Sequence, residues 1–141
     1  MARSLKGVYS PKNPEKYIGN HSPIWRSTWE LAVMRMADNH PSVIHWASEP
    51  YRIPYYNPVS RKNTVYVPDF LLIYEDKTGK RKAELVEVKP KKETYISEAK
   101  RTRDKLVLAI NKAKWKAAQA WAGKNGMSFR VITESDIFVN K

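Results

Sequence analysis

Short apolar runs separated by polar turns fill the middle of this chain. Val65–Tyr74 is rich in β-branched, aromatic and aliphatic residues, and Ala83–Val88 is a second run of the same kind. Such runs are typical of buried strands. The polar segment between them, Asp76–Lys80, contains Gly79, which can take the positive φ that a hairpin turn needs. The pattern therefore predicts an antiparallel hairpin in this region.

Two other segments carry apolar residues at the three-to-four spacing of a helix. They are Ile24–Asn39, which Ser22-Pro23 would open, and Glu98–Ala122, which Gly123 or Gly126 would end. The predicted buried stripes consist of Trp25, Trp29, Val33, Met36 and Ala37 in the first helix, and of Ala99, Leu106, Val107, Ile110, Ala113, Ala117 and Trp121 in the second.

The remaining segments complete one domain, predicted for residues 21–141. Short strands are expected at Val43–Trp46 and Tyr51–Ile53, and a final strand at Ser128–Thr133 precedes a closing turn at Glu134–Ile137. Residues 1–20 are basic and lack periodicity, so they predict an extended N-terminal arm. Its tyrosines, at positions 9 and 17, are candidates to dock on the domain, on DNA or on another protein, and a partly disordered tail is the alternative.

Two carboxylates and one ammonium are expected to meet on the central hairpin. Antiparallel pairing brings Asp69 towards the level of Glu87 and Lys89, which are two residues apart and therefore share a face. Pro68 cannot donate to a ladder, so it marks a strand edge, end or bulge. Such a group can hold Mg²⁺ and place a water against a phosphodiester. The alternative is a kink before the strand and a solvated strand face.

The charge balance agrees with a nucleic-acid partner. There are 26 Lys and Arg residues against 14 Asp and Glu, a net charge of +12, which attracts nucleic acid or an acidic membrane surface. The chain has no cysteine, which excludes disulfides and cysteine-based zinc sites and fits a reducing cytoplasm. No segment has the length of a membrane span or the pattern of a signal peptide, so no membrane partner is expected.

These motifs together resemble the PD-(D/E)xK nuclease superfamily over about residues 24–137. The resemblance implies an α/β fold with a restriction-endonuclease-like core, a mixed central sheet flanked by helices. The site would be a Mg²⁺-dependent DNA endonuclease site in which Mn²⁺ substitutes. Asp69 and Glu87 would ligate the metal, the carbonyl of Val88 would add a ligand, and Lys89 would orient or deprotonate the attacking water or steady charge on the phosphate.

Within that superfamily, two families are similar to the chain. The endonuclease subunit of heteromeric transposases is similar in Trp29-Glu30, Pro68–Phe70 and Glu87–Lys89. The head-completion protein of large tailed bacteriophages is similar over nearly the whole chain, which makes it the more specific resemblance. The segments that carry this second resemblance are Gly7–Gly19, Arg26–Glu30, Trp46–Glu49, Ile53–Tyr55 and Glu87–Lys91.

The phage resemblance implies a virion protein at the packaged head, assembled in the host cytoplasm. Its partners would be double-stranded DNA and portal, head or connector proteins. A transposase-type or restriction-type endonuclease and a structural head protein with an idle site remain alternatives. The sequence does not predict the oligomeric state, the DNA structure that is cut or any sequence preference.

Two further carboxylates are candidates for the site. Ser27-x-x-Glu30 matches a capping box, yet Glu30 is also a candidate for the third, helix-borne carboxylate that many nucleases of the superfamily place at the metal. Glu49, in Ser48-Glu49-Pro50, is a candidate neighbour of the metal, and a turn or salt-bridge residue is the alternative.

Two basic segments are candidates for DNA contact. The loop 57–63 holds Arg61 and Lys62, and basic loops at the rim of a sheet commonly meet a DNA backbone. The long helix carries an excess of bases on its polar face, and related nucleases use Lys or Gln from this helix in the site. The helical candidates are Lys105, Lys112, Lys116 and Gln119, of which the last three are expected to face the site. A solvated loop and a solvated helix face are the alternatives.

Overall fold

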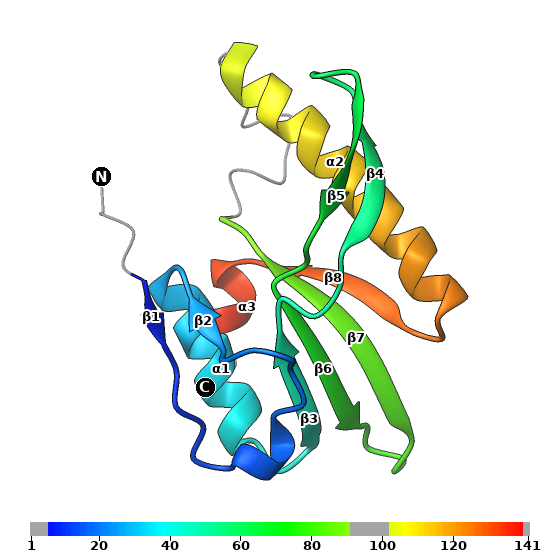
Figure 1. Cartoon of the computed structure of the whole chain (residues 1–141). Helices are drawn as coiled ribbons and strands as arrows, with labels where there is room; N and C mark the ends of the chain where they lie inside the picture. Colours follow the sequence, from blue (N-terminus) through cyan, green and yellow to red (C-terminus); the bar gives the residue numbers. More distant parts are fainter. Residues whose placement is uncertain (1–5, 91–101, 140–141) are drawn as a thin grey trace.

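A four-stranded mixed sheet forms the centre of the molecule (Figure 1). The computed structural model describes residues 6–90 and 102–139. Strand order is β3-β6-β7-β8, in which β6 pairs antiparallel with both β3 and β7 and β8 runs parallel to β7. The four strands are β3 (Val43–Ser48), β6 (Phe70–Glu75), β7 (Arg81–Val88) and β8 (Ser128–Ile132). Helices flank this sheet, so the predicted fold class is confirmed.

The two long helices pack on opposite faces of the sheet. Helix α1 (Thr28–Asn39) buries Val33, Met34 and Ala37 in a cluster that includes Val86 and Val88 of β7. Helix α2 (Thr102–Lys124) buries Ala118 and Ala122 in a second cluster that includes Leu85. Because side chains alternate between the faces of a strand, Leu85 and Val86 point to opposite sides. Both faces of β7 are therefore covered, which leaves its end as the place where polar groups can meet solvent.

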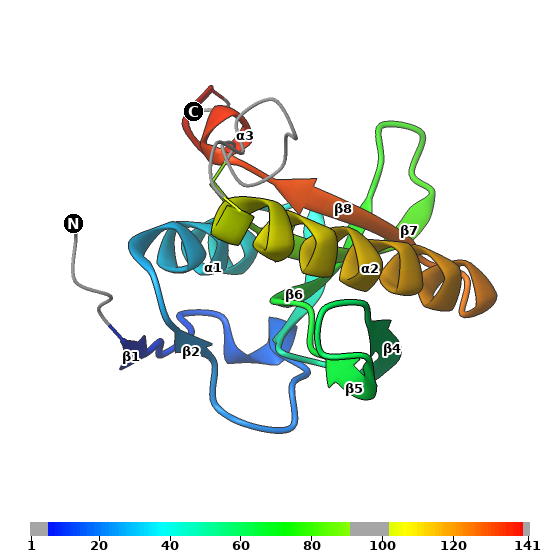
Figure 2. The ribbon, with the colours of Figure 1, turned by 90° about the horizontal axis from the view of Figure 1, so that it is seen from above.

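A separate two-stranded hairpin lies beside α2 (Figure 2). It consists of β4 (Ile53–Asn57) and β5 (Lys62–Tyr66), paired antiparallel from Ile53–Tyr66 to Asn57–Lys62. Ile53 and Tyr55 are buried in the same cluster as the inner residues of α2. The end of the chain adds helix α3 (Glu134–Val139), which contacts α1.

The described part of the N-terminal segment packs on the domain. Strand β1 (Gly7–Val8) pairs with β2 (Ile24–Trp25), and a short 3₁₀ helix, η1, covers Pro14–Lys16. The rings of Tyr9 and Tyr17 lie 6.1 Å and 4.7 Å from the ring of Trp46, centroid to centroid. In the structure these tyrosines dock on the domain itself, which is one of the three partners considered for them.

Several predicted boundaries are corrected. Ile24–Trp25 is a strand, and the first helix begins only at Thr28 because Ser27 caps it. The strand expected at residues 51–53 lies at 53–57, so the turn of its hairpin is shorter than the predicted loop. The segment after β8 is a helix instead of a turn. The predicted start of the long helix, residues 98–101, lies outside the described residues.

The buried stripe of α2 also differs from the predicted one. Its buried residues are Leu108, Asn111, Ala118 and Ala122, whereas Leu106 and Val107 are 45% and 40% exposed. The predicted Ile110, Ala113, Ala117 and Trp121 are partly buried. In α1, Val33 and Ala37 are buried as predicted, while Met34 takes the place of Met36. The turn residues behave as expected, because Gly79 and Gly126 have φ of 80° and 72°.

Candidate active site

Asp69 lies where the chain enters the central sheet. Phe70 pairs with Val86, so Asp69 reaches the level of Glu87 as predicted. Its Oδ2 accepts a hydrogen bond of 2.7 Å from the backbone N–H of Val88, and its carbonyl accepts one of 2.8 Å from that of Glu49. Pro68 is fully buried just before β6, which confirms the predicted strand end. These bonds hold the carboxylate of Asp69 against the end of β7.

Glu87 is buried, with 6% of the residue exposed, on the face of β7 that α2 covers. Its Oε1 accepts a hydrogen bond of 2.7 Å from the hydroxyl of Tyr66, and its Oε2 lies 3.8 Å from the ammonium of Lys89. Glu87 and Lys89 thus share a face, as predicted. The alternative of a solvated strand face is wrong for Glu87, because its carboxylate is enclosed by protein.

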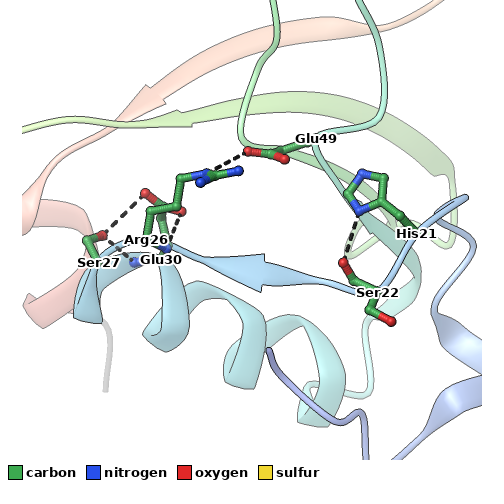
Figure 3. Close-up of polar contacts among 6 residues, drawn as sticks. All are labelled: His21, Ser22, Arg26, Ser27, Glu30 and Glu49. Carbon is green, nitrogen blue, oxygen red and sulfur yellow. Dashed lines mark hydrogen bonds and ion pairs between the residues drawn. The ribbon is translucent and has the colours of Figure 1, made fainter. Parts of the chain in front are cut away.

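Glu30 takes part in the N-terminal cap that Ser27 provides for α1, and it lies within electrostatic range of the two sheet carboxylates. The hydroxyl of Ser27 accepts a hydrogen bond of 3.1 Å from the N–H of Glu30, and Glu30 Oε1 accepts one of 3.1 Å from the N–H of Arg26 (Figure 3). The capping prediction is therefore confirmed. The negative charge of Glu30 also raises the pKa of Asp69 and of Glu87. Capping and a place beside the site are compatible in this structure.

Arg26 connects Glu30 to Glu49 (Figure 3). Its Nε lies 3.1 Å from Glu49 Oε2, in an ion pair whose arginine side chain is half exposed. Glu49 has φ of 48°, a left-handed conformation that is uncommon for a residue other than glycine. Glu49 therefore lies in a turn and forms a salt bridge, which was the alternative to a place next to the metal. Burial raises the pKa of Glu30 and the charge of Glu49 raises it further, so Glu49 belongs to the same acidic group.

The two sheet carboxylates of this group, Asp69 and Glu87, both have raised pKa values. Burial raises the pKa of Asp69 well above its usual value, and the charges of Glu87 and Glu30 raise it further. Burial also raises the pKa of Glu87, although Tyr66, Lys89 and Lys114 oppose the change. Among the described residues, no three His, Cys, Asp or Glu side chains already stand close enough to hold a metal ion. One buried and one partly buried carboxylate with an adjacent backbone carbonyl still form an oxygen donor set that suits a hard divalent cation.

Lys114 of α2 is the helical lysine that lies at this site. Its ammonium stands 5.6 Å from the centroid of the Tyr66 ring. Burial and the charge of Lys89 lower the pKa of Lys114, while Glu87 and Asp69 act in the opposite direction. From the sequence, Lys114 counts among the bases on the polar face of its helix, which were expected to contact DNA or, alternatively, solvent, and it was not expected in the site. The helical repeat places Lys114 on the side of α2 opposite to Lys112 and Lys116, but the repeat alone does not show which of the two sides faces the site.

Lys112, Lys116 and Gln119 were expected to face the carboxylates, and the structure gives them other neighbours. Together with Trp115, Phe129 and Val131 they line a cleft of about 320 Å³ between α2 and β8. The other DNA candidates are exposed: Lys105 on α2, Arg61 in the hairpin turn and Lys62 at the start of β5. Tyr66 was missed altogether, because its link to Glu87 joins residues 21 apart in the chain.

Comparison with known proteins identifies the family of the chain. The family model described as TnsA-like endonuclease N terminal matches residues 40–134, a segment that contains Asp69, Glu87, Lys89 and Lys114. The chain belongs to the TnsA-like endonuclease family. It is also 34% identical over 145 residues to the head completion nuclease of Enterobacteria phage T4, with 95% of this chain and 94% of that protein covered. The resemblance to PD-(D/E)xK nucleases is thereby confirmed.

The two comparisons cover different parts of this TnsA-like endonuclease chain. The family match begins after Glu30, so the helix-borne carboxylate and Arg26 lie outside it. The phage protein matches almost the full length and so reaches into the N-terminal region. Among the described residues, no helix has the length and hydropathy needed to cross a membrane.

Proposed function

We propose that the protein is a Mg²⁺-dependent DNA endonuclease that acts in bacteriophage head completion. The observation that carries the proposal is the meeting of Asp69, Glu87 and Lys89 at the end of β7, where Glu87 is buried, Asp69 is partly buried and burial raises the pKa of both carboxyl groups. Membership of an endonuclease family and the similarity to a head completion nuclease support it. The net charge of +12 supports DNA as the substrate.

In this proposal one oxygen of each carboxylate keeps its hydrogen bond and the other would turn to the ion. Asp69 Oδ2 accepts from the N–H of Val88, so Oδ1 would be the ligand; Glu87 Oε1 accepts from the hydroxyl of Tyr66, so the ligand would be Oε2, which also lies 3.8 Å from the ammonium of Lys89. These two oxygens and the carbonyl of Val88 would hold the ion, with Mn²⁺ able to replace Mg²⁺. A divalent cation bound there supplies the positive charge that polarises the phosphodiester and activates water.

The two lysines and Glu30 act around these oxygens. Lys89, 3.8 Å from Glu87, orients or deprotonates the attacking water or steadies the charge of the phosphate. Lys114, whose pKa is lowered by burial and by Lys89, adds a second cation beside the phosphate. Glu30 would complete the metal shell directly or through water. Positioned charge of this type is usually the largest contribution to catalysis of phosphoryl transfer.

The proposed setting is the packaged head of the virion. The substrate would be double-stranded DNA at or near the head, and portal, head or connector proteins would be the partners. The near-complete coverage of the head completion nuclease favours this setting over a transposase or restriction system.

Cutting of plasmid DNA tests the proposal. Wild-type protein should nick or cut plasmid with Mg²⁺ or Mn²⁺, and EDTA should stop it. Asp69→Ala, Glu87→Ala and Lys89→Ala should each abolish cutting while the protein remains folded. Glu75→Ala is the matched control, because Glu75 is exposed at the other end of β6, and it should cut normally.

The same experiment separates an active site from an idle one. Removing Asp69 or Glu87 relieves repulsion between buried like charges, so the melting temperature should stay the same or rise. A wild-type protein that binds a divalent metal yet leaves every DNA form intact would refute the nuclease. The structural head protein would then be the better account.

A further inference from the structure

The β4–β5 hairpin extends away from the central sheet as a ribbon of two strands (Figure 1). Each strand has five residues, which at about 3.3 Å per residue gives a ribbon of roughly 17 Å. One face is fixed to α2 through Ile53 and Tyr55. Strand β4 is therefore held against α2, while the other face of the ribbon and its turn remain at the surface.

The open face carries polar and aromatic side chains. Tyr56 pairs with Asn63, and Pro54 pairs with Val65, so these four residues lie on the same side of the ribbon. All four side chains are exposed, Tyr56 to 54% and Val65 to 40%. Strand β5 is exposed from Lys62 to Val65. An amide and a phenol thus stand side by side on a surface that no described segment covers.

The charge of the ribbon has one sign. Between residues 51 and 67 the chain contains Arg52, Arg61 and Lys62 and no Asp or Glu. The turn is preformed: Asn57 Oδ1 accepts hydrogen bonds from the N–H groups of Val59 and Ser60, at 2.9 Å and 3.1 Å. Arg61 has φ of 58° and its N–H donates to the carbonyl of Asn57 at 2.8 Å. The basic tip is thus built into the fold before any partner arrives.

The base of the ribbon is tied to the active site. Tyr66, the last residue of β5, donates its hydroxyl to Glu87, and Asp69 follows three residues later. A partner held by the ribbon therefore has a fixed position relative to both carboxylates.

We propose that the β4–β5 hairpin lies in the major groove of duplex DNA and sets where the duplex meets Asp69 and Glu87. A two-stranded ribbon fits the major groove, which is about 12 Å wide and 8.5 Å deep. Arg61 and Lys62 bind phosphates, and the side chains of Asn63 and Tyr56 reach base edges. This inference rests on the proposed function, because it names the duplex as the substrate of the same site.

Matched charge variants test the contact. Arg61→Ala/Lys62→Ala removes two positive charges from the ribbon. Lys77→Ala/Lys80→Ala removes two from the exposed β6–β7 turn at the far end of the sheet (Figure 1). Binding to a duplex oligonucleotide is measured against salt with Ca²⁺ in place of Mg²⁺. The ribbon variant should lower the log–log salt slope by about 1.8, at roughly 0.9 for each lost phosphate contact. The turn variant should keep the wild-type slope.

A second pair of measurements locates the groove. Methylation of guanine N7, a major-groove atom, should interfere with binding of the wild type near the cutting position. Tyr56→Ala/Asn63→Ala, which changes no charge, should lose that interference while its melting temperature stays close to that of the wild type. The proposal would be overturned if the ribbon variant and the turn variant had equal salt slopes. It would also be overturned if a minor-groove ligand, and not methylation of guanine N7, interfered with binding.

Binding and cutting are scored separately, so that the two proposals fail in different ways. A protein that binds duplex through the ribbon but never cuts would refute the nuclease and keep the ribbon contact. A protein that cuts duplex DNA while the ribbon variants bind like the wild type would refute the ribbon contact and keep the nuclease. Variants that bind DNA normally but no longer enter phage heads would identify the ribbon as a protein contact and overturn the inference.

Discussion

The hydroxyl of Tyr66 donates a 2.7 Å hydrogen bond to Oε1 of Glu87, and this bond joins the β4–β5 hairpin to the central sheet. Burial raises the pKa of Tyr66, and the charge of Glu87 raises it further, so the phenol remains a donor at any physiological pH. The bond fixes one oxygen of Glu87 and thereby directs the other. Tyr66 is thus a positioning residue for the proposed metal ligand.

Tyr66→Phe should lower the apparent affinity for Mg²⁺ more than it lowers the cutting rate at saturating Mg²⁺. The variant keeps the ring but frees the carboxylate of Glu87, and loss of such outer partners typically costs 10–100-fold in metal affinity or activity. We expect half-maximal cutting to require about tenfold more Mg²⁺, with the maximal rate largely recovered. Tyr55→Phe, on the same hairpin, is the control. Identical Mg²⁺ titrations for wild type and Tyr66→Phe would remove Tyr66 from the site.

Glu30→Gln separates the two roles of Glu30. Gln also serves a capping box, so the helix should keep its stability, yet the negative charge beside Asp69 and Glu87 is lost. If Glu30 belongs to the metal shell, the cutting rate should fall by orders of magnitude and recover partly at high Mg²⁺ or with Mn²⁺.

The control for this prediction is Ser27→Ala. It weakens the cap by about 1 kcal/mol and should spare cutting at moderate temperature. Cutting rates and melting temperatures of both variants decide the question. A fully active Glu30→Gln protein would confine Glu30 to capping its helix.

Lys114→Met should impair cutting far more than Lys116→Met. Both changes remove one charge from α2 and keep a long side chain, but Lys114 lies beside Tyr66 and acts on Glu87, whereas Lys116 lines the cleft against β8. We expect a loss of at least tenfold in the cutting rate for the first variant and less than twofold for the second. Equal losses would indicate that both lysines act through the general positive field alone.

The local pattern of the sequence was sufficient to predict contacts between two strands that are joined by one short turn. The two-residue period of β6 and β7 and the turn at Gly79 determine the register, so Asp69 and Glu87 were placed correctly. It was insufficient where distant segments meet. The pairing of Ile24–Trp25 with β1 shortened the first helix.

The helical lysine was misassigned for a related reason. Apolar residues lie on more than one side of α2, and only its packing on the sheet shows which side is buried. Once Leu108, Asn111, Ala118 and Ala122 face inward, Lys114 borders the buried stripe and Lys112 and Lys116 fall on the other flank. The contact between Tyr66 and Glu87 has no local signal, because it depends on how the hairpin docks.

Asp38 should make the attachment of the N-terminal segment depend on pH. It is fully buried and accepts hydrogen bonds from Tyr9 Oη at 2.5 Å and from the N–H groups of Lys12 and Asn13 at 2.7 Å and 3.0 Å. Burial alone would raise the pKa of Asp38, but these bonds outweigh it and lower the pKa. The folded protein therefore stabilises the ionised form of Asp38 more than the unfolded chain does.

The stabilisation by Asp38 is fully present above the unfolded pKa of about 3.9 and is lost as the pH falls through that value to the lower folded pKa. Asp38→Asn should cost about 2 kcal/mol at neutral pH, as expected for lost hydrogen bonds to a charged group. The difference in melting temperature between wild type and variant should shrink below about pH 4. Tyr9→Phe, which removes one of these donors and keeps the charge, should show a smaller loss. A gap that stays constant from pH 7 to pH 3 would mean that the charge of Asp38 does not hold the segment, and shape alone would then account for its packing.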